Sequence, residues 1–63
     1  MTDEEKIAAV ALVAATKMRE SQIPSAMSYD MAERVFAELR KKGVQLPPGF
    51  TAALTVKIKA LLK

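Results

Sequence analysis

The stretch IAAVALVAA, from Ile7 to Ala15, contains nine apolar residues without a break in a chain of 63 residues. A run of this length is too short to cross a bilayer, which needs about 20 apolar residues. On a helical wheel at about 100° per residue, the run divides among several faces of a helix. It therefore predicts a helix that is covered on more than one side.

The residues on either side of this run set the limits of the first helix. Thr2 and Glu5 have the spacing of a capping box, in which each side chain bonds the backbone N–H of the other residue. Pro24 cannot continue a helix and favours an extended conformation at Ile23. We therefore predict a helix over about residues 3–20, followed by a loop of about six to eight residues.

Capping and turn residues predict two further helices in the same way. Ser28 is the expected N-cap of a helix over about residues 29–42, and Gly43 is expected in the left-handed position after its end. A rigid turn at Pro47–Gly49 then leads into a third helix over about residues 49–62. With no β pattern in competition, the fold class is all-α, and residues 1–63 form a single small three-helix bundle.

The first helix has more apolar surface than two short helices can cover. One seam is predicted to pack on the other two helices, and it consists of Ile7, Ala11, Ala14 and Met18. A second seam is Val10 with Val13, and a third seam is Ala8, Leu12 and Ala15. The surplus consists of Val10 with Val13 and of Ala8 with Leu12. We expect homodimerisation through the first helix, with Val10, Leu12 and Val13 as the self-association residues. The alternative is a monomeric bundle that exposes this mostly alanine surface.

The composition excludes several kinds of chemistry. Cysteine and histidine are both absent, which removes disulfides, thiolate and imidazole metal ligands, and nucleophiles activated by histidine. The two glycines are isolated, so no glycine-rich phosphate loop exists. We therefore expect no catalytic, cofactor-binding or metal-binding residues, and no enzyme.

The cellular location of the protein is predicted from its composition, its first residues and its length. A cysteine-free chain is typical of a reducing cytoplasm, and the acidic start MTDEEK differs from the basic start of a secretory signal. The length is typical of small bacterial and phage proteins, which is an argument from size alone. We expect a cytoplasmic protein that does not act on membranes, because TAALTVKIKALLK (residues 51–63) lacks tryptophan and has an apolar side that the core needs.

The function that we infer from these patterns is a protein-interaction module of the adaptor, inhibitor or assembly-factor type. The apolar surplus of the first helix supports this inference. In the loop QIPSAM (residues 22–27), Ile23 and Met27 are expected to be exposed for partner contact. The protein partner is not identified by any of these residues.

Nucleic-acid binding is the alternative function. Six basic residues could contact phosphates, namely Arg40, Lys41, Lys42, Lys57, Lys59 and Lys63. Both connections between helices are, however, longer than the three or four residues of a helix-turn-helix. The third helix also offers no Arg, Asn or Gln to read base edges.

Overall fold

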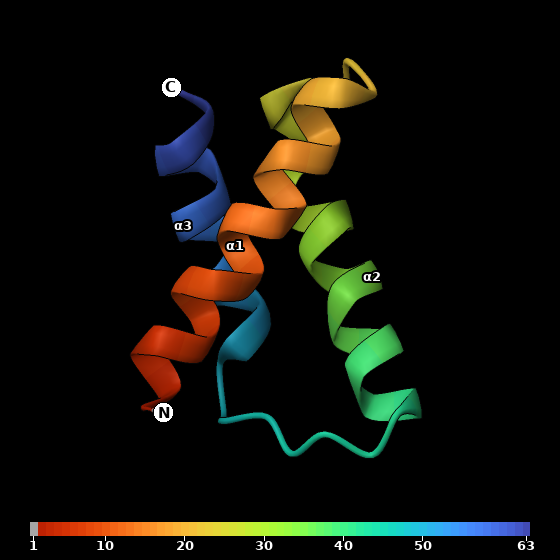
Figure 1. Cartoon of the computed structure of the whole chain (residues 1–63), viewed down its shortest axis with the longest axis vertical. Helices are drawn as coiled ribbons and strands as arrows, with labels where there is room; N and C mark the ends of the chain where they lie inside the picture. Colours follow the sequence, from red (N-terminus) through yellow and green to blue (C-terminus); the bar gives the residue numbers. More distant parts are fainter. Residues whose placement is uncertain (1) are drawn as a thin grey trace.

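The chain folds into three α-helices and one short 3₁₀ turn, as the computed structural model shows for residues 2–63 (Figure 1). The prediction of a small all-α bundle is confirmed, and each helix begins and ends within one residue of its predicted limits. The elements in chain order are α1 (Asp3–Glu20), η1 (Ser25–Met27), α2 (Ser28–Lys41) and α3 (Phe50–Leu62). Within this described part of the chain, no helix has the length and apolarity needed to cross a membrane.

The two ends of α1 are closed by backbone and side-chain hydrogen bonds. At the start, the Glu5 N–H donates to Thr2 Oγ1 at 3.2 Å, and the Thr2 N–H donates to Glu5 Oε1 at 3.2 Å, which is the predicted capping box. At the end, Gln22 adopts a left-handed φ of 56° and its N–H donates to the Arg19 carbonyl. The Ile23 N–H donates to the Met18 carbonyl at 2.8 Å, which completes a Schellman motif before Pro24 is reached.

The start of α2 differs from the prediction at one residue. Ser28 is the first residue of the helix and is fully buried, and its hydroxyl donates backward to the Ser25 carbonyl at 2.6 Å. The N-cap position is occupied by Met27, which has no side-chain cap bond. The prediction of Ser28 as N-cap is therefore wrong, because the η1 turn supplies the backbone that leads into α2.

Two glycines with positive φ, Gly43 and Gly49, shape the connection between α2 and α3. Gly43 has a φ of 81°, its N–H donates to the Arg40 carbonyl, and the Val44 N–H donates to the Leu39 carbonyl. This second Schellman motif confirms the predicted role of Gly43. Gly49 has a φ of 74° and a ψ of 15°, and the Phe50 N–H bonds the Pro47 carbonyl, as in a type II turn that starts α3.

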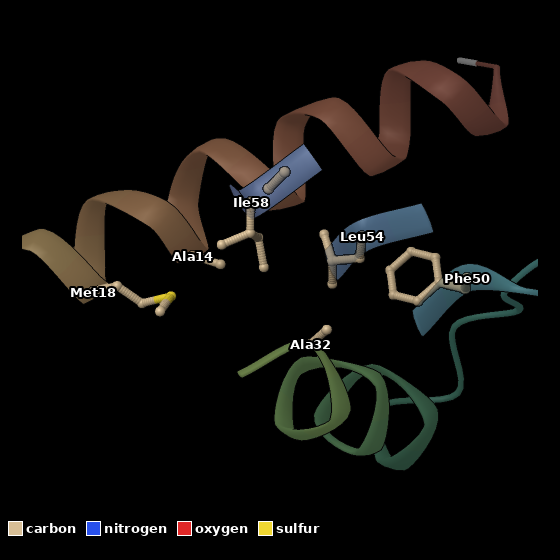
Figure 2. Close-up of a cluster of buried hydrophobic side chains, with 7 residues drawn as sticks. Ala14, Met18, Ala32, Phe50, Leu54 and Ile58 are labelled. Carbon is tan, nitrogen blue, oxygen red and sulfur yellow. The ribbon is translucent and has the colours of Figure 1, made fainter. Parts of the chain in front are cut away.

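Side chains of α3 form the centre of the core. Leu54 and Ile58 are fully buried, and they lie between Ala14 of α1 and Ala32 of α2 (Figure 2). Burial of each such side chain stabilises the fold by about 1.5–3 kcal/mol. On α1 the buried residues are mostly alanines, which let the backbone of α3 come close, and they are Ala11, Ala14 and Ala15 together with Met18.

The three helices do not contact one another equally. Both α1 and α2 pack extensively on α3, whereas α1 and α2 make few contacts with each other. In Figure 1 they lie close together near η1 and diverge toward the N-terminus of α1 and the C-terminal end of α2. The bundle is therefore open on the side where α1 and α2 face each other.

Candidate functional site

A groove of about 700 Å³ lies between α1 and α2 on this open side. Its lining extends from Ala9 to Ser21 on α1 and its C-cap, and from Met31 to Lys42 on α2 and its C-cap. With a rise of about 1.5 Å per residue, each wall is about 17 Å long, which corresponds to about three helical turns. The groove therefore has the length of a short helix.

The α1 wall of the groove is apolar along most of its length. Val10 lies one turn before the adjacent residues Val13 and Ala14 on this wall. Val10 is half-buried against the core, whereas the Val13 side chain is 60% exposed. Two of the three residues predicted for self-association, Val10 and Val13, thus line one surface.

The α2 wall is formed by Met31, Val35 and Leu39, all half-buried. These three residues were not predicted as a binding surface. The feature of the sequence that could have indicated this surface is the wide apolar arc of α2. This arc covers about 160° of the helical wheel at about 100° per residue. One neighbouring helix covers less than this arc, and α2 has only α3 packed extensively against it.

Four charged residues line the groove, and all four are exposed. Lys17 belongs to the α1 wall, and Arg34, Glu38 and Lys42 belong to the α2 wall. Three cations and one carboxylate therefore line this part of the surface. Because α1 and α2 run in opposite directions (Figure 1), Lys17 and Arg34 lie toward the η1 end of the groove and Lys42 lies toward the wide end.

A smaller hollow continues the groove toward η1. Its lining shares Ile23, Met31 and Arg34 with the groove and adds Met27 and Asp30. Met27 is 43% exposed, as expected for a contact residue, whereas Ile23 is partly buried and packs against the core. The structure thus brings both residues predicted for partner contact to the α1 and α2 side of the bundle, although Ile23 is less exposed than expected.

Leu12 is the predicted self-association residue that does not line the groove. Its side chain is 56% exposed on the outer side of α1. Ala15, which belongs to the same predicted seam as Leu12, is fully buried in the structure. The apolar surplus of α1 is therefore split between the groove and a separate outer ridge at Leu12.

The six basic residues of the nucleic-acid hypothesis do not form one surface. Arg40, Lys41 and Lys42 lie at the C-terminal end of α2, whereas Lys63 follows α3 at the opposite end of the long axis (Figure 1). The Arg40 guanidinium carbon also lies 5.7 Å from the centre of the Phe36 ring, a cation–π contact within α2. Nucleic-acid binding through these residues stays a prediction without a shared surface to support it.

A metal cluster and unpaired buried polar side-chain atoms are both absent from the described residues. No three Asp or Glu side chains among residues 2–63 lie close enough to hold a metal ion together. Every buried polar side-chain atom in this range has a hydrogen-bond partner, as at Thr55, whose hydroxyl donates to the Thr51 carbonyl at 2.7 Å.

Comparison with known proteins does not assign the chain to a family. No protein-family model matches the chain, and the searches of curated proteins and of solved structures give no significant match.

Proposed function

We propose that the chain is a helical protein-interaction module that binds a helix of another protein in the groove between α1 and α2. The observation that carries this proposal is that both helices pack on α3 and hardly on each other. The Val13 side chain is thereby left 60% exposed on one wall, and Val35 on the other wall is only partly buried. An amphipathic helix that lies in an apolar groove is a common mode of peptide recognition.

The dimensions of the groove support a helical guest. Its walls are about three turns long. A helix from a partner would take the place of a fourth bundle helix and contact Val10 and Val13 on one side and Met31, Val35 and Leu39 on the other. Burial of this apolar surface supplies the driving force for binding.

Affinity capture with paired variants tests this function. Val13→Glu places a carboxylate on the groove wall, whereas Leu12→Glu makes a similar change at an equally exposed neighbour outside the groove. Proteins that bind the wild type and Leu12→Glu but not Val13→Glu are the expected result. If Val13→Glu retains every partner of the wild type, the groove is not the binding site.

Self-association across the outer ridge of α1 is a second candidate function, favoured by the exposure of Leu12. A leucine that is 56% exposed, with exposed Ala8 one turn before it, offers a small apolar contact for a second copy. Sedimentation equilibrium should then show a dimer that Leu12→Glu dissociates. A monomer mass for the wild type at high micromolar concentration would remove this candidate.

A further inference from the structure

We propose that two copies of the chain associate through the groove side of α2, with their two α2 helices antiparallel. The contact is made by a row of charged side chains along this edge of the helix. This α2 charge row consists of Asp30, Arg34, Glu38 and Lys42. The inference goes beyond the proposed function, because it adds a second copy of the chain as a competitor of the partner helix at the groove.

The α2 charge row follows one edge of the helix, because its residues are four positions apart. Arg34, Glu38 and Lys42 line the groove, and Asp30 lines the hollow that continues the groove toward η1. All four side chains are exposed, so another molecule can reach them. Their signs alternate along the row, which leaves this edge of α2 neutral.

The order of the charges makes the row complementary to itself in one arrangement. When two rows run antiparallel about a twofold axis, Asp30 faces Lys42 of the second copy and Arg34 faces Glu38 of the second copy. A parallel twofold arrangement places each residue opposite itself, and an antiparallel slip of one turn places Arg34 opposite Arg34. Both alternatives bring like charges together. Because charge complementarity fixes orientation and register, the row selects an antiparallel twofold dimer.

Apolar side chains near the row supply most of the driving force for this contact. Exposed ion pairs alone stabilise an interface little. Met27 is 43% exposed in the hollow beside Asp30, and Val13 is 60% exposed on the opposite wall of the groove. A second copy that lies along the row covers these side chains, and their burial favours association. Charge therefore sets how the two copies pair, and apolar burial sets how tightly they bind.

An alternating row also stabilises its own helix through pairs of residues four positions apart. The two roles respond differently to reversal of a charge. Loss of pairs within the helix lowers the stability of one chain, whereas loss of pairs between two copies lowers the mass of the assembly. Only the second effect is reversed when two oppositely changed variants are mixed.

Complementary charge reversals test the dimer by sedimentation equilibrium of the full chain. Arg34→Glu makes the centre of the row acidic, and Glu38→Arg makes it basic. Because like charges then meet across the twofold axis, each variant alone should have a dimer dissociation constant at least about tenfold above that of the wild type. An equimolar mixture of the two variants should form a heterodimer, and the double variant should recover the homodimer.

Two exposed residues outside the row serve as matched controls. Glu33→Arg reverses a neighbouring charge on α2, and Leu12→Glu changes the outer ridge of α1, and neither residue lines the groove. Both variants should keep the mass of the wild-type dimer. Dissociation by Glu33→Arg to the same extent as by Arg34→Glu, or dissociation by Leu12→Glu, would overturn the inference.

Three further results would also overturn it. These are a wild type that is monomeric at high micromolar concentration, a dimer that neither reversal weakens, and a mixture of the two variants that stays monomeric. A monomeric wild type would leave the proposed function intact, because binding of a partner helix is measured separately by its loss in Val13→Glu.

Discussion

The Arg19 guanidinium of α1 donates a hydrogen bond from Nη2 to the backbone carbonyl of Leu61 in the last turn of α3. The last four carbonyls of a helix have no partner within the helix, and a cation near them also interacts favourably with the helix dipole. One exposed side chain therefore connects the C-terminal ends of the two helices that share the alanine-rich contact.

Removal of this connection should weaken the fold. Arg19→Met keeps much of the apolar stem and removes the donor, and we expect the free energy of unfolding to fall by about 1 kcal/mol. Urea denaturation followed by circular dichroism measures the change. Lys17→Met is the control, because it removes a cation from the same last turn of α1. Equal losses in the two variants would assign the effect to charge alone and not to the bond with Leu61.

Replacement of the left-handed residue after α1, Gln22, by glycine should stabilise the fold. Gln22 has a φ of 56°, a conformation that costs a non-glycine residue about 1–2 kcal/mol. Gln22→Gly removes most of this cost but adds chain entropy to the unfolded state, so we expect a net gain of about 0.5 kcal/mol in the free energy of unfolding. Thermal or urea denaturation measures the gain.

The same substitution at Gln45 is the matched control for Gln22→Gly. Gln45 is exposed in the loop between α2 and α3 and is not among the residues with positive φ. Gln45→Gly should therefore only lower stability, through chain entropy. A gain at both positions, or at neither, would contradict the assignment of conformational cost to Gln22.

The capping box of α1 predicts a dependence of stability on acid pH. Bonds from the Thr2 backbone N–H and then from the Thr2 hydroxyl lower the pKa of Glu5 below its ordinary value of 4.5. A group with a lowered pKa in the folded state contributes stability that is present above pH 4.5 and is lost as the pH falls through the folded pKa. Glu5→Gln should therefore be less stable than the wild type at neutral pH and should approach it in strong acid.

Thermal unfolding of both proteins across the acid range measures this difference. Thr2→Ala removes the hydroxyl partner, so Glu5→Gln should change the acid profile less in that background. Identical acid profiles for Glu5→Gln and the wild type would show that the capping box has no part in acid stability.

The close contact of α1 and α3 should tolerate no larger side chain at Ala11. Ala11 is fully buried, and added methylene groups in a packed core cost about 1–3 kcal/mol. We expect Ala11→Leu to lower the free energy of unfolding by this amount in urea denaturation. Ala8→Leu, three residues earlier at an exposed position, should change it little. A neutral Ala11→Leu would mean that α3 can move away from α1 without loss.

The limits of the helices were predictable because their signals are local. Thr2 with Glu5 and the glycine at position 43 act through neighbouring backbone groups, and the structure uses them as expected. Gln22 was not predictable as a left-handed residue, because glutamine rarely adopts that conformation. Ser28 was misassigned because the sequence does not indicate the η1 turn before it.

Only part of the groove could be predicted from the sequence. Leu12 and Val13 are adjacent apolar residues of similar exposure, and only the placement of α2 beside α1 makes Val13 a wall residue. Helical periodicity gives the faces of each helix but not the angle between two helices that both pack on a third. The contribution of Val35 therefore appears only in the three-dimensional structure.

The dependence of α1 and α2 on α3 also has a consequence for the order of folding. Residues 21–49 separate α1 from α3, whereas residues 42–49 alone separate α2 from α3. Loop closure is faster and less costly over the shorter span, so α2 and α3 should pair first and α1 should dock last. During synthesis α1 is made first but has almost no surface to pack on until Leu54 and Ile58 have left the ribosome. The nine apolar residues of Ile7–Ala15 thus have no packing partner from the time they emerge until α3 follows, and chaperones have that interval in which to bind them.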